Sequence, residues 1–182
     1  MGFIVNIYLT SRQLRFPLQT SPKKGQPTLI CWGAAQDQAF QKLKQALAKK
    51  PILRIPDFSR EFIIQTDASE SGVGAALLQE FDDGKFPIEY ASKKLLPRES
   101  RYSVIERECL AVVWAVRRFV KYLYGRPFIL ETDHHPLAYL NQVHFSNARL
   151  VRWTLFLQNY RFQVRAIDGK SNVVADYLSR AN

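Results

Sequence analysis

The sequence predicts an α/β fold, in which one sheet carries helices on its faces. The first observation is the order of the segments, β-β-β-α-β-α-α-β-α, with three strand-like runs before helices and strands alternate. The second is that short turns join the first three strands whereas helices join the later ones, as in a meander followed by crossover connections. The third is that two apolar strands, FIIQTD and FILETD, each end on a carboxylate, Asp67 and Asp133.

Length and composition set the expected domain organisation. A chain of 182 residues with 47% hydrophobic residues is long enough to bury one core and to carry an appendage. We predict a poorly defined N-terminal segment over residues 1–30, a small helical and extended linker segment over 31–60, and the main domain over 61–182. Within the linker segment, Gln36–Lys50 is expected to form an amphipathic helix that stops at Pro51.

Each remaining element is predicted from its own pattern. Runs of apolar and β-branched residues between turn residues indicate strands, and apolar residues at spacings of three and four indicate helices. The expected strands are FIIQTDA (62–68), GVGAALLQE (72–80), PIEYAS (87–92), RPFILETD (126–133) and RFQVRAI (161–167), with FDDGK (81–85) as a hairpin turn. The expected helices cover residues 98–124, 136–141, 147–158 and 171–180.

Helix phase assigns faces to the long helix over residues 98–124. At about 100° per residue, Glu108 lies at the edge of the apolar stripe and is expected to reach over the sheet, whereas Glu106 is expected to face solvent. The apolar stripe that should face the sheet consists of Ile105, Cys109, Val112, Val116, Phe119 and Leu123. The far polar face should hold Arg107, Arg117, Arg118 and Lys121.

Charge and cysteine content narrow the class of protein. The formal net charge of +10 is concentrated in residues 1–60, and such a basic balance gives solubility or favours an anionic partner such as nucleic acid. Cys31 and Cys109 stand far apart, which argues against a disulfide framework or a cysteine-based zinc site and fits a reducing compartment. The N-terminal apolar run is too short for a membrane span and has no basic region before it, so we expect an intracellular protein without a secretory signal or transmembrane segment.

Four acidic residues form a candidate metal site. Asp67 and Asp133 end strands that could be neighbours, Glu108 would then hang above them, and Asp176 stands at the start of the last helix. Clustered carboxylates repel one another, and an oxygen-rich pocket of this kind is what Mg²⁺ or Mn²⁺ requires. Two such ions can activate a water molecule and stabilise the leaving oxygen in a phosphodiester displacement. Taken singly, each acid has an ordinary interpretation as a turn, cap or solvated helix residue, and only their combination favours the site.

The motifs that carry these residues resemble the ribonuclease H domain of gypsy-type LTR retrotransposon reverse transcriptases. The similarity covers about residues 30–181 and includes FIIQTDASESGVGAALLQ, YASKKLLPRESRYSVIERECLAVVWAV, FILETDHHPLAYL and NVVADYLSR. The resemblance implies a ribonuclease H-like fold, with a mixed five-stranded sheet and helices on both faces. It also implies that residues 31–60 are the remnant of a polymerase-to-RNase H linker. The catalytic residues and ligands of two Mg²⁺ or Mn²⁺ ions would be Asp67, Glu108, Asp133 and Asp176.

The function that the resemblance implies is endonucleolytic cleavage of the RNA strand of an RNA:DNA hybrid. A polymerase domain would be its partner, and this chain contains no palm-type Tyr-x-Asp-Asp of its own. A hybrid is bound through its wide minor groove and its phosphates, which favours small polar and basic residues. The candidates are Ser69, Gly72, Gly74, Lys93, Lys94, Arg98, Arg101, Arg149 and Arg152, and the basic ones are equally well interpreted as solvated surface charges. His134 and His135 are expected to be structural or to lie at the substrate edge, and not to bind zinc.

Three other functions stay open at this point. A transposase or integrase of related fold is one, because Asp168 lies thirty-five residues after Asp133, although it falls in the turn IDGK and not on a helix. An inactive or domesticated retroelement remnant, which binds nucleic acid or a protein partner without cleavage, is the second. The third is an acidic pocket that binds metal without a nuclease role, and no positive feature supports it.

Overall fold

The computed structural model of the chain describes residues 33–34, 37–38, 40–41, 53–133 and 147–180. The chain divides into two compact units, residues 1–52 and 53–182, and the second unit contains the sheet. In the predicted linker helix, residues 37–38 and 40–41 are α-helical, and the rest of that helix lies outside the described residues. Other predictions outside them concern residues 1–30, His134, His135 and the helix over 136–141. The three-part division of the chain stays a prediction.

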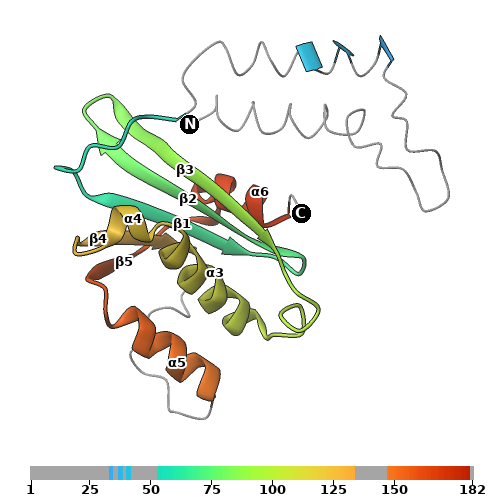
Figure 1. Cartoon of the computed structure of the whole chain (residues 1–182), viewed down its shortest axis with the longest axis vertical. Helices are drawn as coiled ribbons and strands as arrows, with labels where there is room; N and C mark the ends of the chain where they lie inside the picture. The colour runs from blue at the N-terminus through green and yellow to red at the C-terminus, as the bar shows by residue number, and fades with distance from the viewer. Residues whose placement is uncertain (1–32, 35–36, 39, 42–52, 134–146, 181–182) are drawn as a thin grey trace. The chain divides into compact units, whose positions relative to one another are not determined.

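The described part of the second unit contains a five-stranded sheet. Its strands are β1 (Phe62–Ala68), β2 (Gly72–Phe81), β3 (Gly84–Lys94), β4 (Phe128–Thr132) and β5 (Phe162–Ala166), in the order β3-β2-β1-β4-β5 (Figure 1). The β1–β2 and β2–β3 pairs are antiparallel, whereas the β1–β4 and β4–β5 pairs are parallel. The predicted mixed sheet is confirmed, and so is the FDDGK turn, at which Phe81 pairs with Gly84.

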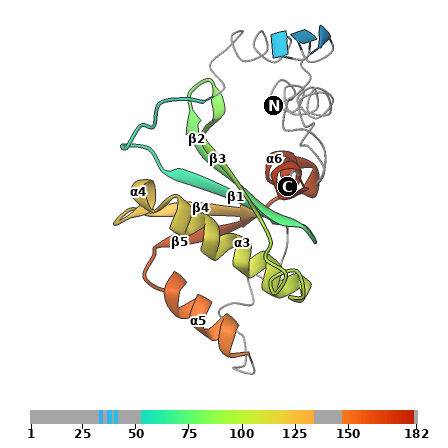
Figure 2. The ribbon, with the colours of Figure 1, turned by 45° about the vertical axis from the view of Figure 1, so that its right-hand side comes forward.

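Helices cover both faces of this sheet. They are α3 (Val104–Arg118), α4 (Val120–Leu123), α5 (Ala148–Leu157) and α6 (Val173–Arg180), with a short 3-10 turn, η2 (Gly169–Ser171), before α6. Helix α3 packs on β1 and β2 from one side and carries α5, whereas α6 packs on the other side (Figures 1 and 2). The prediction of helices on both faces is confirmed. None of the helices in the described ranges is long and apolar enough to cross a membrane.

The central strand β1 is apolar at consecutive positions because both of its faces are covered. Phe62 and Ile64 belong to the larger core, which includes residues of α3, α5 and β4. Ile63 belongs instead to a smaller core with Ala76 and Ile129, against which Val174 of α6 packs. Successive side chains of a strand point to opposite faces, so a strand between two layers needs apolar residues in an unbroken run. The two layers hold β1 in place and thereby fix the carboxylate near its end.

Helix α3 begins at Val104, later than the sequence pattern predicted. The Ser103 hydroxyl accepts a hydrogen bond from the backbone N–H of Glu106, and the Glu106 carboxylate accepts one from the backbone N–H of Ser103, which makes a capping box. Ile105, on the first turn, is 48% exposed, so its expected place facing the sheet is wrong. The rest of the predicted stripe is buried, as expected: Cys109, Val112, Val116, Phe119 and Leu123.

Helix α6 lies directly on β2 because Gly74 has no side chain. A Cβ at Gly74 would come within 2.3 Å of the Ala175 carbonyl oxygen and 2.5 Å of the Ser179 backbone nitrogen, closer than real Cβ contacts. The missing side chain therefore sets the height of α6 above the sheet. It also sets the position of Asp176 in the first turn of that helix.

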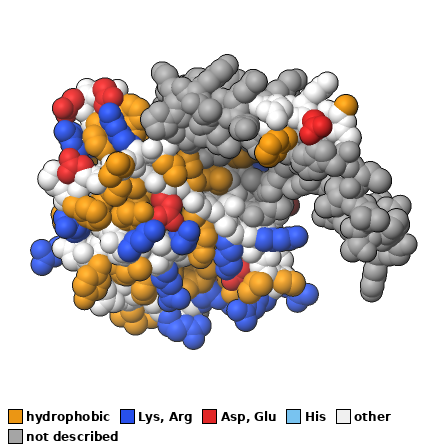
Figure 3. Space-filling model, turned by 45° about the horizontal axis from the view of Figure 1, so that its top comes forward, with side chains coloured by type: hydrophobic (Ala, Val, Ile, Leu, Met, Phe, Trp, Pro, Cys, Tyr) orange, Lys and Arg blue, Asp and Glu red, His pale blue; other side chains and the backbone are white. Residues whose placement is uncertain are grey.

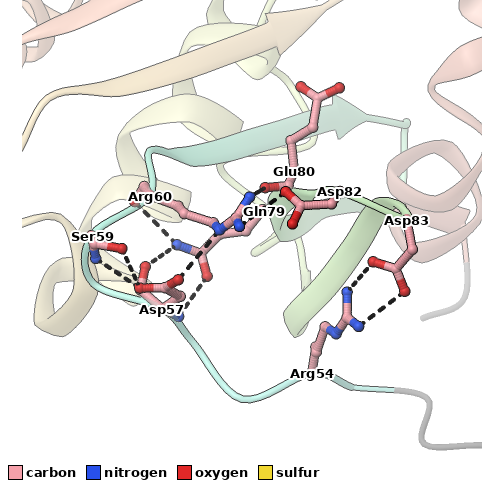
Figure 4. A network of polar contacts seen from close by, with 8 residues as sticks. All are labelled: Arg54, Asp57, Ser59, Arg60, Gln79, Glu80, Asp82 and Asp83. Atoms are coloured by element: carbon pink, nitrogen blue, oxygen red, sulfur yellow. Dashed lines mark hydrogen bonds and ion pairs between the residues drawn. The ribbon is translucent and has the colours of Figure 1, made fainter.

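Residues 53–60, which fall within the predicted linker segment, are attached to the β2–β3 hairpin (Figure 4). The side-chain amide of Gln79 is fully buried, and it accepts a hydrogen bond from the backbone N–H of Asp57 over 2.9 Å. The same amide donates to the carbonyl oxygens of Asp57 and Arg60, at 2.6 and 3.1 Å. Two ion pairs at the surface add to this attachment: Arg54–Asp83 and Arg60–Asp82.

Candidate active site

Two carboxylates, those of Asp67 and Asp133, lie at the same end of the sheet, where the neighbouring strands β1 and β4 finish. These strands run parallel with Gln65 opposite Glu131, so Asp67 and Asp133, each two residues further on, follow in the same direction. Asp67 is 6% exposed and Asp133 is partly buried. The prediction that the two acids stand at the ends of neighbouring strands is confirmed.

The side chain of Glu108, on helix α3, reaches the same end of the sheet. Its side chain is 2% exposed, and its carboxylate is hydrogen-bonded by the backbone of Ala68, the residue that follows Asp67. Burial, together with the negative charges of Asp67 and Asp133, raises the pKa of Glu108 to about 8. The predicted reach of Glu108 over the sheet is confirmed.

The environment of Asp67, like that of Glu108, disfavours a negative charge on the carboxylate. Burial raises its pKa above the ordinary value, and the negative charges of Asp176 and Asp133 raise it further. A hydrogen bond from Ser179 and the positive charge of Arg180 lower this pKa in part. The Oδ2 atom of Asp67 is buried without a hydrogen-bond partner, which costs about 1–3 kcal/mol for a typical polar group. A cation at this oxygen would remove that cost.

Asp176, the fourth acid, faces an arginine of its own helix. Its Oδ1 accepts a hydrogen bond of 2.8 Å from Nε of Arg180 and also contacts the Nη2 nitrogen of that guanidinium. The Asp176 side chain is 42% exposed, whereas Glu108 is almost fully buried. The negative charge of Asp176 raises the pKa of Asp67, while the Asp176 carboxylate itself is held by Arg180.

The four acids match a divalent cation in chemistry, although they do not close around one point. Among the residues that the structure describes, no three Asp, Glu, His or Cys side chains converge closely enough to hold a metal ion as they stand. Asp67 and Glu108 nevertheless both lie within the electrostatic influence of Asp133, and Oδ2 of Asp67 has no competing donor. Carboxylate oxygens are the ligands that Mg²⁺ and Mn²⁺ prefer. These residues therefore fit such an ion in kind, and binding requires a rearrangement of side chains.

Asn172 is part of this site, and sequence reasoning missed it. The residue is fully buried, and its Nδ2 donates to the Thr66 carbonyl oxygen and to Oδ1 of Asp133, both at 3.0 Å. One amide thus ties the segment before α6 to β1 and restrains one oxygen of Asp133. An Asn directly before a helix ordinarily indicates a cap, so its sequence signal predicts a helix start but not this bridge.

The expected solvent exposure of Glu106 is wrong. Its side chain is 12% exposed, because it caps α3 and also binds Asn147 and Arg149 at the start of α5. Burial alone would raise the pKa of Glu106, but hydrogen bonds from Asn147, Ser103 and Arg149 lower it below its ordinary value. Glu106 therefore fastens the beginnings of α3 and α5 to each other.

The expected place of Arg107 on the far polar face is wrong as well. Its guanidinium donates a hydrogen bond of 3.3 Å to the Ser69 carbonyl oxygen, and its charge lowers the pKa of Glu108. Arg107 therefore stands at the rim of the acidic site. The other predicted members of that polar face are exposed: Arg117, Arg118 and Lys121.

Three of the predicted substrate contacts lie in the turn between β1 and β2 or at the start of β2: Ser69, Gly72 and Gly74. The Ser69 hydroxyl donates to the Ser179 carbonyl oxygen at 2.7 Å and accepts from the backbone N–H of Gly72 at 3.0 Å, so it holds the turn against α6. Gly72 and Gly74 are both buried. The close approach that Gly74 allows is to helix α6 and not to an open surface.

The predicted basic contacts divide into paired and exposed residues. Lys93 forms an ion pair of 2.8 Å with the buried Glu99, and Arg149 pairs with Glu106 and lies 3.9 Å from the ring centroid of Tyr102. Figure 3 shows a face on which Lys and Arg side chains are interspersed with apolar ones. The exposed candidates are Lys94, Arg98, Arg101 and Arg152.

A further buried acid, Glu131, differs from Glu108 because neighbouring groups compensate for the burial of its charge. Glu131 is 1% exposed, and burial alone would raise its pKa, but hydrogen bonds from Lys85 and Gln65 and the charge of Arg165 lower it. Its partners therefore compensate for burial, which is not the case for Glu108.

Asp168, the acid that suggested a transposase, accepts a hydrogen bond from the backbone N–H of Lys170 and caps the turn η2.

The order of the sheet, with helices on both of its faces, is that of a ribonuclease H-like α/β fold. A foamy viral protease-reverse transcriptase, solved in complex with an RNA/DNA hybrid, aligns with 88% of this chain and 22% of its own, with a TM-score of 0.57 and 16% identity. The family model for the RNase H-like domain found in reverse transcriptase matches residues 57–160. The chain belongs to this family, as an RNase H-like domain of gypsy-type LTR retrotransposon Pol polyproteins.

Two relatives show the extent of the likeness. The retrovirus-related Pol polyprotein from transposon 297 of Drosophila melanogaster is 44% identical over 143 residues, which is 79% of this chain and 13% of that protein. The transposon Tf2-3 polyprotein of Schizosaccharomyces pombe is 39% identical over 173 residues, which is 92% of this chain and 13% of that protein. The chain thus spans about an eighth of the length of these relatives.

Proposed function

We propose that this chain is a ribonuclease H-type endonuclease that hydrolyses the RNA strand of an RNA:DNA hybrid. The observation that supports this most is the pair Asp67 and Glu108, two buried acids whose pKa values are raised beside a third acid, Asp133. A fold keeps such incompletely compensated acids at a cost, and they cluster at functional sites. Glu131, which is as deeply buried but fully paired, is the internal contrast.

The proposed ligands of two Mg²⁺ or Mn²⁺ ions are the four acids Asp67, Glu108, Asp133 and Asp176. Divalent cations bound there would supply a water molecule of lowered pKa and neutralise charge on the leaving oxygen. The protein's part is to hold the carboxylates: β1 and β4 fix Asp67 and Asp133, and Asn172 restrains one oxygen of Asp133. Glu108 must lose its proton to act as a ligand, and a nearby positive charge favours that loss.

The proposed substrate is an RNA:DNA hybrid, the ligand with which the foamy viral structure was solved. A hybrid presents phosphates and 2′-hydroxyls to the protein, so exposed basic side chains and small polar groups near the acids suit it. Lys94, Arg98, Arg101 and Arg152 are exposed and are the proposed phosphate contacts. The other proposed contacts with the hybrid are Ser69, Gly72, Lys93 and Arg149. The side chains of Ser69, Lys93 and Arg149 would bind the hybrid either while they keep their present hydrogen bonds and ion pairs or after those are broken. We leave Gly74 out, because α6 covers it. A polymerase domain on the same polyprotein is the proposed partner that delivers the hybrid.

The test is cleavage of a hybrid whose RNA strand carries an end label. With Mg²⁺ or Mn²⁺ present we expect RNA fragments, and neither single-stranded RNA nor duplex DNA should be cut. Asp133→Asn should reduce cleavage to background, because it removes a charged ligand. Asp82→Asn makes the same change on a hairpin acid whose side chain is 92% exposed, and it should cleave like the wild type.

The main alternative is a domain that binds nucleic acid or a protein partner without cutting. Folded, metal-supplemented wild-type protein that leaves the hybrid intact would overturn the enzyme function. Retention of the same hybrid in a gel-shift measurement would then favour the binding function. Circular dichroism on each variant ensures that lost cleavage is not lost folding.

A further inference from the structure

The ion pair between Asp176 and Arg180 lies on α6, the helix that packs beside Asp67: Gly74, the partner of Asp67 in the sheet, lies against backbone atoms of Ala175 and Ser179. Asp176 and Arg180 are four residues apart on α6, so their side chains share one face of the helix. The Arg180 guanidinium binds Oδ1 of Asp176 through Nε and Nη2. Its positive charge also lowers the pKa of Asp67, so the guanidinium acts on a second acid of the site.

The ion pair determines which group the Asp176 carboxylate contacts. Asp67 and Glu108 are buried beside Asp133, whereas the carboxylate of Asp176 is turned to the arginine. Acids brought together repel one another, and a positive charge among them offsets that repulsion. Arg180 supplies such a charge from within the chain.

We propose that Arg180 is the internal counter-ion of the candidate metal site: its guanidinium holds Asp176 while no divalent cation is bound, and a cation that enters must take Asp176 from it. This inference rests on the proposed function, because it assumes that the four acids bind a divalent cation. The metal-free and metal-bound proteins would then differ in which positive group Asp176 contacts.

Because the ion pair between Asp176 and Arg180 is exposed, replacing Arg180 by a cation at Asp176 costs little free energy. The Arg180 side chain is 69% exposed and stands at the end of α6, so a released guanidinium is solvated without disturbing the core. Ion pairs this exposed contribute little to stability, so a divalent ion loses little affinity in displacing one. A buried counter-ion would instead oppose metal binding strongly.

The experiment measures Mn²⁺ binding by isothermal titration calorimetry on the full chain, without nucleic acid. Arg180→Gln removes the competing charge and keeps a polar side chain, so we expect Mn²⁺ to bind about two- to fivefold more tightly than to the wild type. Arg118→Gln is the matched control, because Arg118 is a 53% exposed arginine of α3 whose ion pair with Glu89 lies on another surface. Its Mn²⁺ affinity should equal that of the wild type.

A second readout follows the arginine itself. In ¹⁵N NMR spectra, the Nε–H resonance of Arg180 should move toward the position of a solvated arginine as Mg²⁺ is added, while that of Arg118 stays. A resonance of Arg180 that does not move, or Mn²⁺ affinity in Arg180→Gln equal to or weaker than in the wild type, overturns the inference.

The two proposals fail in different ways. If the wild type binds Mn²⁺ and cleaves the hybrid, and Asp133→Asn abolishes both, the proposed function stands even where Arg180→Gln changes nothing. If the wild type binds no Mn²⁺ in the absence of nucleic acid, the counter-ion inference is wrong whatever the cleavage assay gives. Thermal unfolding checks the variant, since Arg180→Gln should show a larger rise in Tm on Mn²⁺ addition than the wild type.

Discussion

Nδ2 of Asn172 lies 3.0 Å from Oδ1 of Asp133 and 3.0 Å from the carbonyl oxygen of Thr66, so one buried amide joins the segment before α6 to the ends of β1 and β4. Asn172→Ala leaves the Thr66 carbonyl oxygen without this donor in a buried place. We expect the free energy of unfolding to fall by about 1–3 kcal/mol, as measured by urea denaturation. Cleavage should fall too, because Asp133 loses its restraint.

The control for this prediction is Asn159→Ala, which removes an exposed asparagine amide that donates to the Leu155 and Phe156 carbonyl oxygens. It should cost much less stability and leave cleavage unchanged. The positioning role of Asn172 is contradicted if Asn172→Ala, measured well below its Tm, cleaves with the wild-type kcat and needs no more Mg²⁺.

The raised pKa of Glu108 makes the stability of the metal-free protein depend on pH. The unfolded carboxyl titrates near 4.5 and the folded one near 8, so between these values the folded state holds a proton that the unfolded state has lost. The free energy of unfolding should therefore fall as the pH rises from about 4.5 to about 8, by an amount on the order of a few kcal/mol. Urea denaturation in EDTA at several pH values measures this slope.

Glu108→Gln cannot titrate, so its stability should fall less over the same range. The comparison with the variant also removes any contribution that is common to both proteins, such as that of histidine, a residue type that ordinarily titrates in this range. Carboxyls with lowered pKa, such as that of Glu131, contribute to stability above their unfolded pKa and lose it only at lower pH, outside this window. Equal slopes in the two proteins would show that Glu108 does not hold the proton.

Gly74 should tolerate no side chain. In Gly74→Ala the new Cβ would meet backbone atoms of Ala175 and Ser179 at 2.3 and 2.5 Å, so α6 must lift from β2. We expect the free energy of unfolding to fall by about 1–3 kcal/mol or more, and the displaced Asp176 should weaken Mn²⁺ binding. Gly169→Ala offers a milder comparison, since its Cβ would meet only the Asp133 carboxylate, at 3.2 Å. A Gly74→Ala protein as stable as the wild type would contradict the packing argument.

Local pattern was enough to predict most of the fold, and long-range contact explains what it missed. The strand ends at Asp67 and Asp133 and the reach of Glu108 follow from periodicity, because a buried strand and a helix stripe each repeat in sequence. The bonds of Asn172, and of Glu106 to the start of α5, join residues far apart in the chain. Such pairings depend on how layers stack, which no spacing rule encodes.

The first residue of α3 was predicted wrongly for a different reason. The sequence contains the capping signal Ser103-x-x-Glu106, but the helical pattern predicts a start at Arg98, five residues earlier. In the structure the intervening turn is organised by Glu99, which accepts hydrogen bonds from Lys93 and from the backbone N–H of Leu96. That turn competes with the helix for the same residues, and the partly buried ion pair between Lys93 and Glu99 stabilises the turn.

The last prediction concerns Gln79, whose amide fastens residues 53–60 to β2 (Figure 4). Gln79→Met keeps the length of the buried side chain and removes its hydrogen bonds, so backbone groups of Asp57 and Arg60 lose their partner. We expect a loss of about 1–3 kcal/mol in the free energy of unfolding and faster hydrogen exchange at the Asp57 amide. Asp83→Asn, which removes the charge of an exposed ion pair with Arg54, should change both quantities much less. If Gln79→Met leaves the Asp57 amide protected, the surface ion pairs and not the buried amide hold this segment, and Arg60→Ala should then expose it.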